Sequence, residues 1–248
     1  LVRNQVKVKG EGVQWNGRLS VLHQENCGCY QARLNALKQI TTPYFGFADA
    51  DDAVDPVMFE RMLRFAEDQE LDVVQCGFDG EQDEFKLWAD GCVLGSREEV
   101  WNGFAKPVLI EGKGGGAFVW NKLYRNQYDF SSFDPTDHDT NFEDMIFNLQ
   151  FFLKVERMGF LTAPLYHYAM VEGSAVHSFS ESKLKDFREV VRVRRALLPR
   201  YGVDPDGEEN RAWFKLNRMN CIKSTIRAGN LTVGQKMALL VKLLKGKM

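Results

Sequence analysis

Three carboxylates between Asp49 and Asp52 directly follow a short aromatic run, residues 44–47. The aromatic run predicts a buried strand, and the carboxylates would lie at its C-terminal end. In open α/β sheets, ligands bind at the carboxyl ends of the strands. Carboxylates this close together repel one another unless a cation lies between them. A helix N-cap explains Asp55, but it does not explain Asp49 and Asp51, so we expect a functional role for that pair.

Strand-like and helix-like segments alternate over the first 180 residues, which predicts a layered α/β domain. Beyond residue 180 the pattern is helical to the end of the chain. We therefore divide the chain into an α/β domain, residues 1–180, and a basic helical region, residues 181–248. The predicted strands are 19–23, 44–47, 72–78, 84–89 and 160–168, and the predicted helices are 29–40, 57–67, one opening at Ser96, 145–155, 181–198, 208–228 and 232–245.

The charge is divided unevenly between these two parts. Residues 1–182 carry 16 lysines and arginines against 28 acidic residues, whereas residues 183–248 carry 16 against 6. From Arg211 onward there are nine basic residues and no acidic one. This end is suited to an anionic surface, such as phospholipid or a phosphorylated acceptor, although solvated helix faces would explain it equally well. The last helix, 237–245, is apolar with flanking lysines, so it either lies on a membrane surface or packs on the domain.

The cysteines and the hydropathy bear on the compartment. The five cysteines are scattered and odd in number, which indicates reduced thiols. No apolar run approaches the ~20 residues of a membrane span. We expect a cytoplasmic protein, with peripheral contact at the inner face of the cell membrane and no nucleic-acid partner.

Four further residues could carry chemistry, each with a structural alternative. Arg33 lies in the first turns of a predicted helix, whose N-terminus suits an anion such as a diphosphate; a surface salt bridge would explain it equally. Glu143 and Asp144 open another helix, where the helix dipole stabilises carboxylates, but a carboxylate held there could also act as a general base. His167 stands near the end of the last predicted strand, where a lone histidine is more often a packed or surface residue than a metal ligand.

Four sequence blocks, taken in order, resemble the family-two inverting glycosyltransferases of GT-A type, which build bacterial polysaccharide and lipopolysaccharide. Each block is modest alone, but their order and spacing over residues 19–180 make the set specific. The blocks are His23-Gln24-Glu25-Asn26-Cys27-Gly28 with Ala32-Arg33, Phe47-Ala48-Asp49-Ala50-Asp51-Asp52 with Asp55-Pro56, Val119-Trp120-Asn121-Lys122-Leu123-Tyr124-Arg125, and Phe142-Glu143-Asp144 with Leu165-Tyr166-His167-Tyr168 and Ser174.

This resemblance implies a hexosyl- or N-acetylhexosaminyltransferase that uses a nucleotide-diphosphate sugar and Mg²⁺ or Mn²⁺. The acceptor would be a cell-envelope glycan or a lipid-linked molecule. Asp144 would deprotonate the acceptor hydroxyl, with Glu143 in support. The implied metal ligands are Asp51, Asp49 and His167, and the implied nucleotide contacts are Asn26, Arg33 and Asp49.

The chain departs from the family pattern at its start. Two strands that normally hold the nucleobase and ribose have no counterpart, so we expect a GT-A domain that lacks its N-terminal strands. Leu34 also stands where the family usually has asparagine. Two other functions remain open. One is a metal-dependent phosphoesterase or nucleotidyltransferase using the same carboxylates, and the other is a non-catalytic membrane-associated module built on the basic helices.

Overall fold

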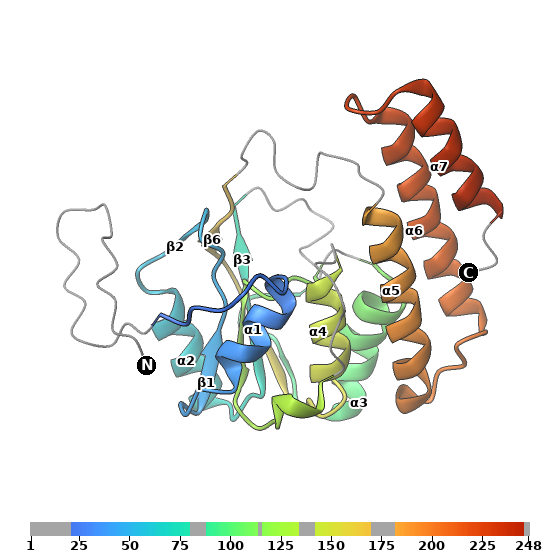
Figure 1. Cartoon of the computed structure of the whole chain (residues 1–248). Helices are drawn as coiled ribbons and strands as arrows, with labels where there is room; N and C mark the ends of the chain where they lie inside the picture. The colour runs from blue at the N-terminus through green and yellow to red at the C-terminus, as the bar shows by residue number, and fades with distance from the viewer. Residues whose placement is uncertain (1–20, 80–87, 114–115, 134–141, 170–181, 246–248) are drawn as a thin grey trace.

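The computed structural model describes residues 21–79, 88–113, 116–133, 142–169 and 182–245. It consists of a mixed β-sheet with helices on both sides and a group of three long helices at one end (Figure 1). The three last helices of the sequence prediction are confirmed as α5 (Ser182–Leu197), α6 (Glu208–Arg227) and α7 (Val233–Lys245). Within the described part of the chain, no helix is long and apolar enough to cross a membrane.

The sheet places the strand of the acidic cluster beside the strand of the third sequence block. Its order is β1-β5-β3-β6-β2, with β4 paired to β6. β3 and β6 run parallel, and the other pairs are antiparallel. The strands are β1 (Tyr44–Gly46), β2 (Ala53–Val54), β3 (Val73–Phe78), β4 (Val93–Leu94), β5 (Lys122–Arg125) and β6 (Met158–His167).

Alternating side chains of the strands feed two separate hydrophobic cores. Val74 and Leu123 face one side, where α2 (Met58–Asp68) packs through Met58 and Met62. Their neighbours Val73 and Tyr124 face the other side of the sheet. Four helices cover that side: α1 (Cys29–Leu37), the π-helix η2 (Trp101–Ile110), α4 (Glu143–Phe151) and α5. This two-residue alternation is what a strand buried on both faces requires.

The helical end of the chain shares the larger core. Phe187 and Val190 of α5 and Trp213 of α6 are buried in it. Arg194 is fully buried as well: it donates to the carbonyls of Leu109 and Ile110 at the end of η2 and lies 3.9 Å from the Trp213 ring. A cation is favourable at the C-terminal end of a helix, where the carbonyls have no partner within the helix. The boundary at residue 180 remains a prediction.

Two local predictions are corrected. Residues 21–23 form no strand; residues 19 and 20 lie outside the described part, as do residues 84–87 of another predicted strand. Asp55 does not cap α2, because the N-cap residue is Val57. The Asp55 carboxylate instead accepts the Val57 N–H at 2.9 Å, in the turn that precedes α2. The predicted cap at Ser96 is confirmed, since its hydroxyl accepts the Glu99 N–H at the start of α3 (Arg97–Val100).

Candidate active site

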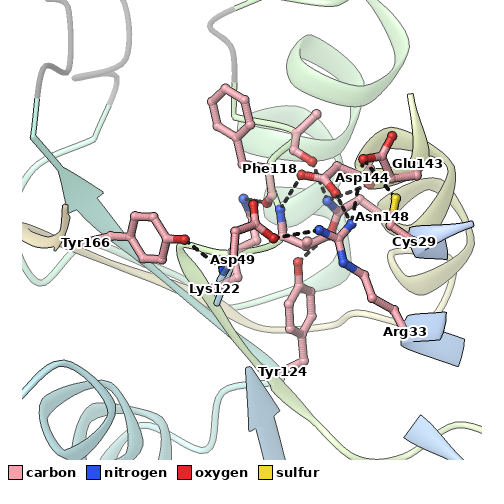
Figure 2. Close-up of polar contacts among 12 residues, drawn as sticks. Cys29, Arg33, Asp49, Phe118, Lys122, Tyr124, Glu143, Asp144, Asn148 and Tyr166 are labelled. Atoms are coloured by element: carbon pink, nitrogen blue, oxygen red, sulfur yellow. Dashed lines mark hydrogen bonds and ion pairs between the residues drawn. The ribbon is translucent and has the colours of Figure 1, made fainter. Parts of the chain in front are cut away.

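Arg33 connects the acidic cluster that follows β1 with the acidic pair at the start of α4, which are about 90 residues apart in the sequence. Its guanidinium donates to Asp144 Oδ1 at 2.7 Å and to Asp49 Oδ1 at 3.0 Å, and it lies 3.9 Å from Glu143 Oε1 (Figure 2). The guanidinium carbon also lies 5.7 Å from the centre of the Phe47 ring. The end of β1, the first turns of α1 and the start of α4 therefore meet at a single cation.

The turn before α1 fixes the direction of Arg33. Gly28 has φ of +85°, which is unfavourable for residues with a side chain, and its N–H is accepted by Asn26 Oδ1. The buried side chains of Tyr30, Leu34 and Leu37 hold α1 against the core. Figure 2 shows that Arg33 projects from α1 toward Asp49 and the start of α4.

The turn after β1 is held by a buried tyrosine. The Tyr166 hydroxyl donates to Asp52 Oδ2 at 2.6 Å and accepts the Asp49 N–H at 3.1 Å. Asp52 also accepts the Ala169 N–H through its other oxygen. Asp52 is therefore occupied by structural hydrogen bonds, and the Tyr166 hydroxyl fixes the backbone at Asp49.

Asp144 is held from both the helix and the facing loop. Its Oδ2 accepts the Val119 N–H at 3.1 Å. Asn148, one turn further along α4, donates to the Asp144 and Ala117 carbonyls and accepts the Tyr124 hydroxyl at 2.9 Å. The loop preceding β5 is thus tied to the helix that carries Asp144.

Lys122 anchors the same loop, the one that precedes β5, through its backbone carbonyls. Its ammonium is fully buried and donates to the carbonyls of Gly116 and Phe118 and to Asn121 Oδ1 (Figure 2). Burial lowers the pKa of Lys122 to about 7, against the attraction of Asp144, which raises it. Because Lys122 is fully buried, a bound substrate cannot contact it directly. Its role in the third sequence block is therefore structural: it anchors the loop before β5.

Part of this arrangement lines a pocket of about 490 Å³. Its polar wall carries Arg33, Asp49, Glu143 and Asp144, and its apolar wall is made of Phe78, Ala117, Phe118, Trp120, Phe142, Met145 and Tyr168. A volume of this size and a mostly apolar lining with a few convergent charges are typical of small-molecule sites. Trp120 stacks on Tyr166 with ring centres 4.4 Å apart, so its role in the wall is at least partly structural.

Burial at this pocket changes the acidity of the two carboxylates at the start of α4. Desolvation and the neighbouring Asp144 raise the pKa of Glu143 to about 7. Desolvation also raises the pKa of Asp144, although Arg33 and the Val119 N–H oppose it. Burial alone would lower the pKa of Arg33, but Asp144 and Asp49 outweigh it and raise that pKa, so Arg33 stays charged. A carboxylate with a raised pKa in a pocket is a candidate for proton transfer.

We expect Glu143→Gln to stabilise the protein at pH 8 and to have almost no effect below pH 4. The folded-state pKa of Glu143 lies above its ordinary value, so ionisation of this carboxyl destabilises the fold as pH rises toward 7. Its Oε2 is buried without a hydrogen-bond partner among the described residues. The neutral amide avoids this cost, which is on the order of 3 kcal/mol at most. Urea unfolding at the two pH values measures it, and an equal effect at both would contradict the proposed cause.

Tyr166→Phe should weaken the binding of ligands at the turn after β1. Removing the hydroxyl leaves the Asp49 N–H and Asp52 Oδ2 without this partner, which costs about 1–3 kcal/mol of the free energy that holds the turn in place. Tyr201→Phe is the matched control, because its hydroxyl donates to the Leu149 carbonyl, away from the pocket. Calorimetry with a nucleotide diphosphate, the ligand that the sequence resemblance implies, should show a several-fold loss of affinity for Tyr166→Phe alone. Equal affinities of the two variants would remove Tyr166 from this role.

The structure brings together only part of the predicted site. Arg33, Asp49, Glu143 and Asp144 meet at the pocket, whereas Asn26 is exposed and its side chain serves the turn before α1. Asp51 is exposed on the turn, and His167 Nδ1 lies 2.5 Å from Asp79 Oδ2. No three or more histidine, cysteine or acidic side chains form a metal-binding group among the residues that the structure describes.

Sequence reasoning missed Tyr166, Asn148 and the structural use of Asp52. Tyr166 was within the fourth block, but nothing in its spacing indicates a partner 114 residues earlier. Asn148 has a weak signal, since a buried asparagine inside an apolar helix needs hydrogen-bond partners.

Comparison with known proteins identifies relatives of this chain. The family model described as "Glycosyl transferase family 2" matches residues 8–130. EpsJ of Bacillus subtilis (strain 168), named an uncharacterized glycosyltransferase, is 32% identical over 160 residues, which are 62% of this chain and 45% of that protein. EpsH of the same strain, also named a glycosyltransferase, is 29% identical over 191 residues, 76% of this chain and 55% of that protein. The chain thus spans about half the length of these curated relatives.

A solved structure supports the fold. The structure titled S. aureus TarS 1–349 in complex with UDP-GlcNAc aligns with a TM-score of 0.57 at 18% identity, covering 91% of this chain and 63% of that chain. This likeness confirms the predicted GT-A fold.

Proposed function

Because residues 8–130 match the family-two glycosyl transferase model and two relatives are named glycosyltransferases, we propose that the chain is a member of this family and a metal-dependent inverting glycosyltransferase. It takes a sugar from a nucleotide-diphosphate donor and transfers it to a cell-envelope polysaccharide, lipopolysaccharide or lipid-linked acceptor. The observation that carries this proposal is the Arg33 cation between Asp49 and Asp144 at one pocket wall. It links a side suited to a diphosphate with a side suited to an acceptor hydroxyl.

Asp144 is the proposed general base. An inverting transfer needs one carboxylate that removes the acceptor proton as the hydroxyl attacks the anomeric carbon from the face opposite the leaving group. The largely buried position of Asp144 and its raised pKa support this role, and the Val119 N–H holds one of its oxygens in a fixed direction. Glu143 has a supporting role in this proposal, because it precedes Asp144 in the first turn of α4 and lies 3.9 Å from the same Arg33 guanidinium.

Arg33 and Asp49 are the proposed donor-side contacts. A guanidinium binds phosphate oxygens well because its donors form a planar fork. Binding of the diphosphate would compete with Asp144 for Arg33 and so free the base when the donor is present. Asn26 acts indirectly in this proposal, by shaping the turn from which α1 begins.

The carboxylates at the turn suit Mg²⁺ or Mn²⁺ in their chemistry. Mg²⁺ is usually held by one or two carboxylates together with substrate phosphates and water, so it does not require a ready-made cluster. Asp51, exposed on the turn, and Asp49 are the proposed ligands. His167 is a further candidate, since metal-binding histidines commonly donate their other ring N–H to a carboxylate, and Asp79 is in reach. When bound, the metal would neutralise charge on the leaving diphosphate.

Product analysis tests the proposal. The purified protein is incubated with a panel of uridine- and guanosine-diphosphate sugars, Mn²⁺ and glycan or lipid-linked acceptors. Release of the nucleoside diphosphate together with a glycosylated acceptor is the expected result. The TarS neighbour solved with UDP-GlcNAc makes that donor the first to try. Release of inorganic phosphate or pyrophosphate instead would identify a phosphoesterase or nucleotidyltransferase and overturn the proposal.

A further inference from the structure

α7 has two apolar faces, of which only one is used inside the chain. Leu239 and Leu243 are buried against α6, in a small core with Ala228. Val233, Met237 and Val241 recur every four residues on a different side of α7 and are 78%, 58% and 42% exposed. We call these three residues the outer face of α7. Figure 1 shows α7 at the outer edge of the molecule, beyond α6 and away from the sheet.

The surroundings of this outer face are basic. From Arg211 to Lys245 there are eight lysines and arginines and no acidic residue. The nearest carboxylates along α6 are Glu208 and Glu209 at its beginning, whereas α7 packs near Cys221 and Ala228 at its other end. The rest of the chain is strongly acidic, so its charge favours only one orientation toward an anionic surface.

From this we propose that the outer face of α7 docks on an anionic phospholipid surface. An amphipathic helix with apolar side chains on one side and lysines around them binds at the lipid interface, with the apolar residues among the acyl chains and the lysines at the headgroups. A protein partner fits less well, because lysine is depleted from protein interfaces and this face has no aromatic anchor. The proposal goes beyond sugar transfer, and it would keep the enzyme beside a lipid-linked or envelope acceptor.

α6 offers additional residues of the same kind. Leu216, Met219 and Ile226 are exposed and, with Lys223 between them, recur at three- and four-residue spacing along one face. These residues increase the apolar and basic area at this end of the molecule.

Vesicle flotation of the full chain tests the proposal. We expect binding to phosphatidylcholine vesicles that contain phosphatidylglycerol, little binding to pure phosphatidylcholine, and a loss of binding as salt is raised. Met237→Gln combined with Val241→Gln should abolish flotation. Lys242→Gln should weaken it about fivefold, the effect of roughly 1 kcal/mol for each basic residue near the surface.

Controls separate this from general effects. Arg64→Gln on α2 removes the same charge from a side chain that is 85% exposed, and Leu22→Gln removes an apolar side chain that is 46% exposed. Neither should change flotation. Unchanged flotation of the Met237/Val241 variant, or equal binding to neutral vesicles, would overturn the proposal. The proposal would also be overturned if the protein bound no vesicles and instead formed a dimer in light scattering that the Met237/Val241 double variant dissociates. Flotation does not depend on activity, so its outcome is separate from that of the proposed function.

Discussion

Asp144→Asn is expected to reduce sugar transfer by about 10²–10⁴-fold, the usual contribution of a general base, while donor binding persists. The amide has nearly the same shape and can still accept the Val119 N–H. It cannot take the proton of the acceptor hydroxyl, however, and it no longer holds Arg33 by charge. Donor affinity is measured by calorimetry with a nucleoside diphosphate and Mn²⁺, and transfer is measured by release of that diphosphate in the presence of acceptor.

The pH dependence of transfer gives an independent check on Asp144. The base must be ionised, so the rate should fall as pH is lowered through its pKa. Because burial raises the pKa of Asp144, this fall should occur above the range near pH 4 that is ordinary for aspartate. Asp68→Asn, on an exposed part of α2, is the control and should leave rate and profile unchanged. Full transfer by Asp144→Asn would move the role of base to Glu143, its neighbour in the same turn.

The sequence predicted best those elements whose local pattern is strong. Helical spacing identified α2 at 57–67 and the C-terminal helices to within two residues. The apolar side chains of α2 and α5 pack against the two main cores, so their spacing follows the helical repeat. The placement of Glu143 and Asp144 in the first turn of α4 was also correct. These features depend on residues close together in the chain, which a pattern can report.

Tertiary partners could not be predicted in the same way. The salt-bridge alternative for Arg33 named no partner, yet its partner Asp144 lies 111 residues away, and only the fold brings the two together. Asp52 belongs to the same acidic cluster as Asp49 and Asp51, and no local pattern indicates that Tyr166 and the Ala169 N–H are its partners. The last helix raised the alternatives of packing or surface binding, whereas in the structure one side of α7 packs and another side is exposed.

Arg33→Met is expected to destabilise the protein by about 2–3 kcal/mol at pH 8 and to abolish measurable donor binding. The side chains of Arg33 and Asp144 are only 18% and 20% exposed, so the substitution leaves a largely buried carboxylate without its counter-ion. Breaking such a pair costs ~3–5 kcal/mol when burial is complete, and solvent access reduces that figure here. Methionine keeps most of the aliphatic volume, so the loss reports charge and hydrogen bonds rather than packing.

A double-mutant cycle shows whether the loss arises at Asp144. Without Arg33, the folded-state pKa of Asp144 rises further, so the destabilisation should shrink as pH falls and this carboxyl becomes protonated. Arg33→Met combined with Asp144→Asn should therefore regain at least ~1 kcal/mol relative to additive effects. Arg195→Met is the control: Arg195 lies 2.8 Å from Asp206, but the pair is exposed to solvent and should contribute little to stability. Equal losses of stability for the two arginine variants, or strict additivity in the cycle, would show that Arg33 is an ordinary surface cation. Arg33 would then not couple the donor side of the pocket to Asp144.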